Sequence, residues 1–207
     1  TEHTPSMETT LMVYTAARIG LWRFCCQCWE APKIEWQEAR ALCLGLDDAG
    51  STSLLRRACG STCSDKSPGP TLGFEVRTLS RGPHWKLSLW DIGGSRQMRR
   101  FWSKYVGEEE AIVWVVDASA RARLAESRAA LGKLLDDGAV RWPILVFANK
   151  VDRPGAASEA EVCAALGLEA LVGGPHARVQ PCSARSGQGI EEGLAWLCEQ
   201  LDGVRRT

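Results

Sequence analysis

The sequence has no excess of either charge and no long apolar run. Its 25 basic and 25 acidic residues give a formal net charge of zero over 207 residues. No electrostatic footprint for nucleic acid or an anionic membrane is therefore predicted. No stretch reaches the roughly 20 consecutive apolar residues that a membrane-spanning helix needs. Histidine is also scarce, because only His3, His84 and His176 are present, which argues against a zinc site.

Cysteine, in contrast, is frequent. The chain has nine cysteines, but it is longer and less cysteine-dense than a typical disulfide scaffold. Most of them fall in predicted strands or helices, where a free thiol acts as a small apolar side chain. This usage indicates a reducing compartment such as the cytosol, a cilium or an organelle matrix.

The chain divides into an N-terminal extension, residues 1–37, and one domain, residues 38–207. Between Leu11 and Cys28 apolar residues recur at near-helical spacing, and Arg18 and Arg23 interrupt them. The pattern predicts an amphipathic helix. Such a helix can lie on a membrane or a partner, or pack on its own domain, and the pattern leaves both open.

Within the domain, short apolar runs alternate with helical patterns. Strands are predicted at Ala41–Gly45, Phe74–Leu79, Trp85–Asp91, Ala111–Asp117, Ile144–Asn149 and Arg178–Cys182. Helices are predicted at Thr52–Ala58, Ser95–Val106, Leu124–Leu135, Ser158–Leu166 and Ile190–Leu201. Ser158 and Glu161 form a predicted capping box. The alternation predicts an α/β fold with a six-stranded, mostly parallel sheet and helices on both faces.

A glycine-rich turn follows the first predicted strand. It reads Gly45-Leu46-Asp47-Asp48-Ala49-Gly50-Ser51-Thr52-Ser53. In such a turn backbone N–H groups and the helix N-terminus attract phosphate. The usual pattern has lysine after the second glycine and then a magnesium-binding Ser or Thr. The residues predicted to contact phosphate are Gly45, Asp48, Ala49, Gly50, Ser51, Thr52, Ser53 and Gly94.

The turn lacks the phosphate-binding lysine, because Ser51 stands in its place, whereas Thr52 keeps the magnesium position. Hydrogen bonds to charged groups contribute about 1.5–3 kcal/mol each, so nucleotide affinity is expected to fall by roughly one to two orders of magnitude or more. Asp47 and Asp48 supply no compensating positive charge.

Three more polar segments follow predicted strands. Asp91, before Ile92-Gly93-Gly94, suits a carboxylate that orients magnesium. Asn149-Lys150-Val151-Asp152 suits guanine recognition, because Asp152 can accept hydrogen bonds from the guanine N–H groups. Cys182-Ser183-Ala184 would close over the base. Four such loops in this order predict a guanine site at the carboxyl edge of the sheet. The predicted guanine contacts are Asn149, Lys150, Asp152, Ser183 and Ala184.

Across residues 39–201 these motifs resemble the Arf and Arf-like branch of the small GTPases. Pro70–Phe74 resembles the first switch of that branch, and Trp90–Gly94 resembles the second. The resemblance implies a small G-protein (P-loop) fold that binds GTP or GDP, with Mg²⁺ held by Thr52, Thr71 and Asp91. It also implies protein effectors that bind the three aromatic residues Phe74, Trp90 and Tyr105.

Within the branch, the chain looks most like the cilium-associated Arf-like GTPase with a Cys-Cys lipid anchor. Cys25 and Cys26 precede the phosphate loop at that group's spacing, and Gln180–Ala184 resembles its guanine-closing segment. S-acylation of Cys25 and Cys26 is therefore expected, with buried thiols at a protein interface as the alternative. The expected location is the cytoplasmic face of a membrane or the cilium, or alternatively an organelle matrix.

The chain departs from the family pattern at a second position as well. Ser95 stands where the family has the glutamine that positions the attacking water, and serine is too short for that task. No catalytic residue is therefore assigned. The leading hypothesis is an Arf-like GTP- or GDP-binding scaffold or slow switch with weak or absent hydrolysis. The alternatives are a working GTPase in which Lys66 supplies the missing charge, and a nucleotide-free structural subunit of a larger assembly.

Overall fold

The computed structural model describes residues 36–60, 69, 71, 73–81, 84–107, 109–136, 143–172 and 176–206. The predicted N-terminal helix, the cysteine pair Cys25-Cys26 and Lys66 lie outside these residues. The predictions made for them therefore stay predictions. Among the described helices, none has the length and apolar character to cross a membrane.

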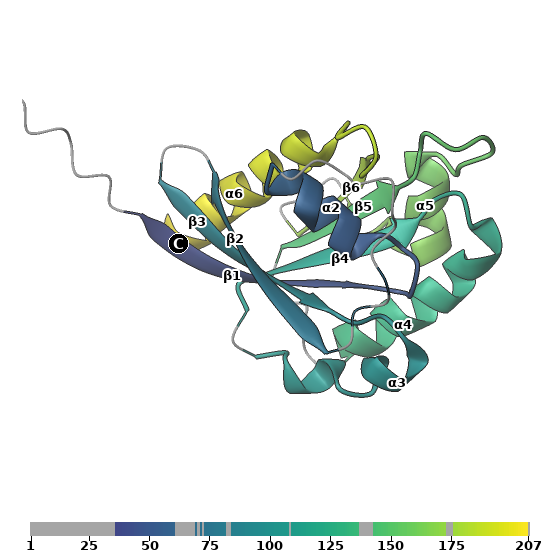
Figure 1. Ribbon diagram of the computed structural model, residues 1–207, viewed down its shortest axis with the longest axis horizontal. Helices are drawn as coiled ribbons and strands as arrows, with labels where there is room; N and C mark the ends of the chain where they lie inside the picture. The colour runs from purple at the N-terminus through teal and green to yellow at the C-terminus, as the bar shows by residue number, and fades with distance from the viewer. Residues whose placement is uncertain are drawn as a thin grey trace, which may run out of the picture. The chain divides into compact units, whose positions relative to one another are not determined.

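Six strands form one sheet in the order β2-β3-β1-β4-β5-β6 (Figure 1). Their bounds are β1 (Gln37–Gly45), β2 (Phe74–Arg81), β3 (Trp85–Ile92), β4 (Ala111–Asp117), β5 (Ile144–Asn149) and β6 (Ala177–Pro181). Only β2 runs antiparallel to its neighbour, β3, and the other pairings are parallel. The predicted six-stranded, mostly parallel sheet is confirmed.

The described helices are α2 (Ser51–Ala58), α3 (Arg96–Arg99), α4 (Leu124–Asp136), α5 (Glu159–Leu166) and α6 (Ile190–Arg206), with short 3₁₀ turns η1 (Trp102–Lys104) and η2 (Arg121–Arg123). α5 begins with the predicted capping box. Ser158 Oγ accepts from the Glu161 backbone N–H, and the Glu161 carboxylate accepts from the Ser158 backbone N–H. This exchange satisfies two N–H groups that a helix start otherwise leaves unpaired.

The helix predicted across residues 95–106 is wrong. The segment forms the four-residue α3 and then η1, joined by hydrogen bonds from Phe101 N to Met98 O and from Lys104 N to Phe101 O. Tertiary packing explains the break. The Trp102 indole donates to Gly93 O over 3.1 Å and packs edge-on against Trp114, with ring centroids 5.5 Å apart.

Two apolar layers cover the sheet. On one face α2 and α6 pack through residues such as Leu54, Leu55 and Leu197. On the other face α4, α5 and η1 pack around Trp114 and Val146. β4 and β5 lie between both layers, which is why their sequences are almost entirely apolar. The sheet thereby holds the loops at its carboxyl edge in fixed positions.

Those loops meet where the connections from β1 and β4 turn to opposite sides of the sheet. β1 lies between β3 and β4, so the ends of these three parallel strands, Gly45, Ile92 and Asp117, are neighbours. A reversal of this kind leaves a crevice outside the carboxyl ends of the strands. The candidate site is built there.

Candidate nucleotide site

The phosphate loop leaves β1 at Gly45 and enters α2 at Ser51 in a backbone path that requires glycine. Gly50 has a φ of 91°, and a Cβ on it would lie 2.5 Å from Asn149 Nδ2. A Cβ on Gly45 would lie 2.4 Å from Val115 O. Ala49 N donates to Leu46 O over 3.1 Å, and Leu54 N donates to Gly50 O over 2.9 Å. The loop is therefore a tight turn that opens directly into a helix, the arrangement that binds phosphate.

The three residues predicted to hold magnesium lie together. Thr52 Oγ1 donates to Asp91 Oδ2 over 2.6 Å, and it lies 2.9 Å from Thr71 Oγ1. Asp91 is fully buried, and its Oδ1 has no hydrogen-bond partner within the described part of the chain. Burial raises the pKa of Asp91, and hydrogen bonds from Thr52 and Ser51 oppose that rise. Two hydroxyls and a buried carboxylate with one unused oxygen fit a hard divalent cation.

Ser51, with a neutral hydroxyl, occupies the position where the phosphate-loop pattern has lysine. Ser51 begins α2, and its hydroxyl lies near Asp91, where it acts to lower the pKa of that carboxyl against the effect of burial. The hydroxyl thus faces the metal-site carboxylate. Ser95 is engaged as well, because its Oγ caps α3 by accepting from Met98 N over 3.3 Å.

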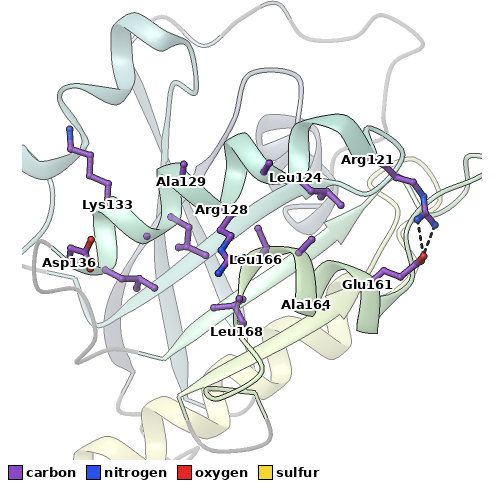
Figure 2. A pocket seen from close by; sticks show the side chains of 16 residues that line it. Arg121, Leu124, Arg128, Ala129, Lys133, Asp136, Glu161, Ala164, Leu166 and Leu168 are labelled. Carbon is purple, nitrogen blue, oxygen red and sulfur yellow. Dashed lines mark hydrogen bonds and ion pairs between the residues drawn. The ribbon is translucent and has the colours of Figure 1, made fainter.

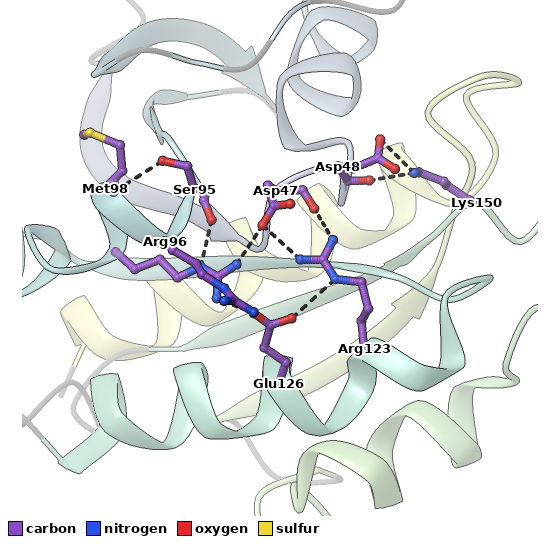
Figure 3. A network of polar contacts seen from close by, with 10 residues as sticks. Asp47, Asp48, Ser95, Arg96, Met98, Arg123, Glu126 and Lys150 are labelled. Carbon is purple, nitrogen blue, oxygen red and sulfur yellow. Dashed lines mark hydrogen bonds and ion pairs between the residues drawn. The ribbon is translucent and has the colours of Figure 1, made fainter.

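Charged side chains hold the phosphate loop from outside (Figure 3). Asp47 Oδ1 accepts from Arg99 over 2.7 Å and from Arg123 over 2.9 Å. Both arginines also contact Glu126, over 2.8 Å and 3.4 Å. Burial acts to raise the pKa of Asp47, but the hydrogen bonds and charge of these arginines lower it below its usual range. We name these four residues, Asp47, Arg99, Arg123 and Glu126, the arginine clamp.

The clamp joins three segments that are distant in sequence. Arg99 Nε donates to Gly94 O over 2.7 Å, and Arg123 Nη1 donates to Asp47 O over 2.6 Å. Asp47 N also donates to Gly94 O over 3.2 Å. The phosphate loop, the loop after β3 and the start of α4 are thus tied together by protein groups alone.

On the base side, two predicted residues hold the phosphate loop to the loops after β5 and β6. Asn149 is buried, and its Nδ2 donates to Ala49 O over 2.9 Å while its Oδ1 accepts from Ala184 N over 3.0 Å. Lys150, with a φ of 66°, donates through Nζ to Asp48 O over 2.6 Å and pairs with Asp117 over 2.8 Å. Burial acts to raise the pKa of Asp117, but the bond and charge of Lys150 lower it.

The other predicted base contacts lie beside this pair. Asp152 is exposed in the turn after Lys150. Burial, reinforced by the negative charge of Asp152, raises the pKa of Cys182 to about 12, so the two side chains are near each other. Ser183 is fully buried, and its Oγ accepts from Ser186 N over 3.2 Å. The exposed Asp152 carboxylate therefore lies near the hydrogen-bonded turn that follows β6.

The three predicted effector aromatics form one cluster. Phe74 stacks on Trp90 with ring centroids 5.2 Å apart and an interplanar angle of 16°, and its ring lies 5.9 Å from that of Tyr105. The Arg40 guanidinium lies 4.0 Å over the Trp90 ring. Phe74 remains 48% exposed at the edge strand β2. A partly exposed aromatic cluster is typical of a binding anchor.

The sequence did not reveal the arginine clamp or the role of Asp117. The sequence does carry a signal for Asp117, because this residue ends the buried strand β4, much as Asp91 is the second-last residue of β3. The clamp could not have been found from spacing, because Arg99 and Arg123 belong to separate elements and meet Asp47 only in the folded chain.

Known proteins of one family are similar to this chain. The ADP-ribosylation factor family matches residues 28–201. The chain is 40% identical over 166 residues to ADP-ribosylation factor-like protein 2 of Dictyostelium discoideum, covering 80% of this chain and 88% of that protein. It is 38% identical over 165 residues to ADP-ribosylation factor-like protein 3 of Chlamydomonas reinhardtii, covering 79% and 91%. The solved structure of the Trypanosoma brucei Arl6 BBS3 small GTPase with bound nucleotide analogue GppNp matches with a TM-score of 0.71, at 27% identity over 80% of this chain and 98% of that one.

Proposed function

This chain belongs to the ADP-ribosylation factor family of small GTPases, and we propose that it is a guanine-nucleotide-binding scaffold or slow switch with very slow or absent GTP hydrolysis. One observation carries the proposal. Ser51 puts a neutral hydroxyl near Asp91 at the expected position of the phosphate lysine, beside the Thr52–Asp91 hydrogen bond and the Asn149 bond to the phosphate loop.

Magnesium fits the cluster of Thr52, Thr71 and Asp91, because the buried Oδ1 of Asp91 has no partner in the described residues. These three side chains would hold the ion. When bound, it would neutralise charge on the outer phosphates. With the lysine absent, the ion and the loop N–H groups would carry more of that task than in a lysine-containing site.

The base side supports guanine as the ligand. Asn149 and Lys150 support the loop on which the phosphates would lie, and exposed Asp152 is available to accept hydrogen bonds from the base. Ser183 and Ala184 would border the base from the loop after β6.

Slow hydrolysis follows from Ser95. Its hydroxyl caps α3, and a serine side chain is too short to hold a water against the phosphate and also contact the phosphoryl oxygens. The same proposal includes three further points. Effectors would bind at Phe74, Trp90 and Tyr105. Acylated Cys25 and Cys26 would anchor the chain, at the cytoplasmic face of a membrane or in the cilium.

Calorimetry with GTP and GDP in the presence of magnesium tests this function. The natural chain is expected to bind about 10- to 100-fold more weakly than a Ser51→Lys variant. Ser51→Ala is the matched control, because it changes the hydroxyl without adding charge. Equal affinity of the natural chain and the lysine variant would contradict the proposal.

A nucleotide-free structural subunit is the second candidate, and one contact favours it. Thr52 donates to Asp91 Oδ2 over 2.6 Å, so part of this cluster is hydrogen-bonded within the protein. Absence of binding by both the natural chain and Ser51→Lys, with an unchanged fold, would favour this candidate.

A further inference from the structure

α4 and α5 lie side by side on one face of the sheet and border an open groove of about 1110 Å³ (Figure 2). Its floor contains the buried leucines Leu131, Leu166 and Leu168. Small residues line its sides, so the backbones of the two helices are accessible to a neighbour. These are Ala125, Ala129, Gly132, Ala164 and Ala165.

The charges along the groove are unevenly neutralised. At one end Arg121 forms two hydrogen bonds with Glu161, of 2.8 Å and 2.9 Å, so these charges compensate each other. At the other end Lys133 and Asp136 are exposed. Arg128 lies between these ends, and its side chain points across the groove towards α5 (Figure 2).

Arg128 is the central cation of this surface. A Cβ on Gly167 would lie 3.0 Å from Arg128 Nη2, which places the guanidinium over the C-terminal cap of α5. In the described part of the chain, Arg128 makes no hydrogen bond and no ion pair. A guanidinium that lies beside apolar side chains, and whose N–H groups meet no acceptor among the described residues, is complementary to a carboxylate that binds in bidentate geometry.

We propose that this groove binds an amphipathic helix of a partner protein, with an apolar stripe over the small residues of the groove and a carboxylate opposite Arg128. A helix fits better than a strand, because the groove runs between two helices and its small side chains admit close packing. The 13 residues of α4 extend about 20 Å, which matches a helical segment of three to four turns. The carboxylate sets the direction and register of the bound helix.

This surface is separate from the aromatic cluster. Phe74 and Trp90 lie on β2 and β3 at one edge of the sheet, whereas α5 packs near β6 at the other edge. A partner helix in the groove would leave the aromatic cluster open to a second protein. The inference does not depend on nucleotide binding.

Two synthetic helical peptides of about 14 residues serve as probes. They share one leucine stripe and differ only in their flanking residues, which are glutamate in one and lysine in the other. In NMR titrations of the ¹⁵N-labelled chain, the glutamate peptide is expected to shift the amides of Ala129, Gly132 and Leu168 in a saturable manner. The lysine peptide is expected to bind about tenfold more weakly or less.

Matched variants separate the groove from the rest of the surface. Ala129→Trp fills the groove and is expected to abolish binding, whereas Ala195→Trp on exposed α6 is expected to leave it unchanged. Arg128→Glu is expected to reverse the preference towards the lysine peptide, and Lys86→Glu on β3 controls for net charge. Retained dispersion of the amide spectrum shows that each variant is folded.

Several outcomes would overturn the proposal. Equal binding of both peptides would remove the role of Arg128, and shifts confined to Phe74, Trp90 and Tyr105 would move binding to the aromatic cluster. Sedimentation that shows self-association lost in Ala129→Trp would make a second copy of the chain the occupant. Binding to phosphatidylserine vesicles lost in Arg128→Glu, without peptide binding, would make a membrane the occupant.

Discussion

The two halves of the candidate nucleotide site are held by protein contacts to different extents. On the base side, Asn149, Lys150, Asp117 and Ala184 form a closed set of hydrogen bonds within the protein. On the phosphate side, Asp91 Oδ1 is buried without a partner among the described residues, and the neutral Ser51 stands where the family pattern is expected to have lysine. The base side therefore stabilises the fold whether or not a ligand is present, whereas the phosphate side depends on a charge that the chain itself does not supply there.

This difference has a physical cause. The base-side residues connect three loops, so their loss would unfold or loosen the carboxyl edge of the sheet. The phosphate lysine contacts mainly the ligand, so its replacement costs the fold little.

The largest expected effect comes from breaking the base side. Asn149→Ala removes the side-chain partner of the buried Ala49 O and also the bond from Ala184 N to Asn149. An unpaired buried polar group costs about 1–3 kcal/mol, so the free energy of unfolding is expected to fall by at least that amount. Urea denaturation measures it. Ser51→Ala is the comparison on the phosphate side. It removes a hydroxyl near Asp91 but leaves no buried backbone group unpaired, so it is expected to cost less than Asn149→Ala. Equal effects of the two substitutions would remove the distinction between the halves.

A smaller effect on the free energy of unfolding is expected from one carboxylate in each half, Asp117 on the base side and Asp91 on the phosphate side. The pKa of Asp117 is lowered in the folded chain, so its ionised form stabilises the fold above the ordinary value of 3.8, and this contribution is lost as the pH falls through its lowered pKa. The pKa of Asp91 is raised, so its ionised form destabilises the fold above that raised value, and the fold regains stability as the pH falls towards 3.8.

Asparagine variants test this opposition. At neutral pH Asp117→Asn is expected to lower the free energy of unfolding and Asp91→Asn to raise it, each by on the order of 1 kcal/mol. The Asp91→Asn difference is expected to shrink as the pH falls through the raised pKa of Asp91, while the Asp117→Asn difference persists until the pH falls below 3.8. Urea denaturation over a pH series, without magnesium, gives both curves. The same sign for both variants at neutral pH would contradict the assignment.

The sequence predicted most of the fold, because its strongest signals are local. Apolar runs predicted β4 and β5, and the Ser158–Glu161 pair predicted the start of α5. Strand ends followed by glycine or polar residues located the phosphate loop and Asp91. β1 begins at Gln37, four residues before the predicted start, because its polar first residues pair with β3 at the rim of the sheet.

What the sequence did not predict depends on distant contacts. The break between α3 and η1 arises because the Trp102 indole donates to Gly93 O and packs against Trp114. Local helix propensity carries no information about such contacts. The arginine clamp likewise joins residues 47, 99 and 123 through side chains. A charged residue on an amphipathic pattern looks the same whether it faces water or another element of the fold.

The smallest expected effect concerns the arginine clamp, which holds the phosphate loop from outside. Asp47→Asn removes the charge that Arg99 and Arg123 share, and because the group is about half exposed its loss is expected to cost only about 0.5–1 kcal/mol. Its effect on nucleotide affinity has a defined sign. Since both arginines lie beside the phosphate loop, their release would add positive charge there, so GTP affinity in the natural chain is expected to rise or stay equal. Glu38→Gln, which breaks an ion pair with Lys86 away from the site, is the control in the calorimetry. A fall in affinity specific to Asp47→Asn would mean that the clamp holds the loop in its phosphate-binding shape, and that order in the loop matters more than the local charge.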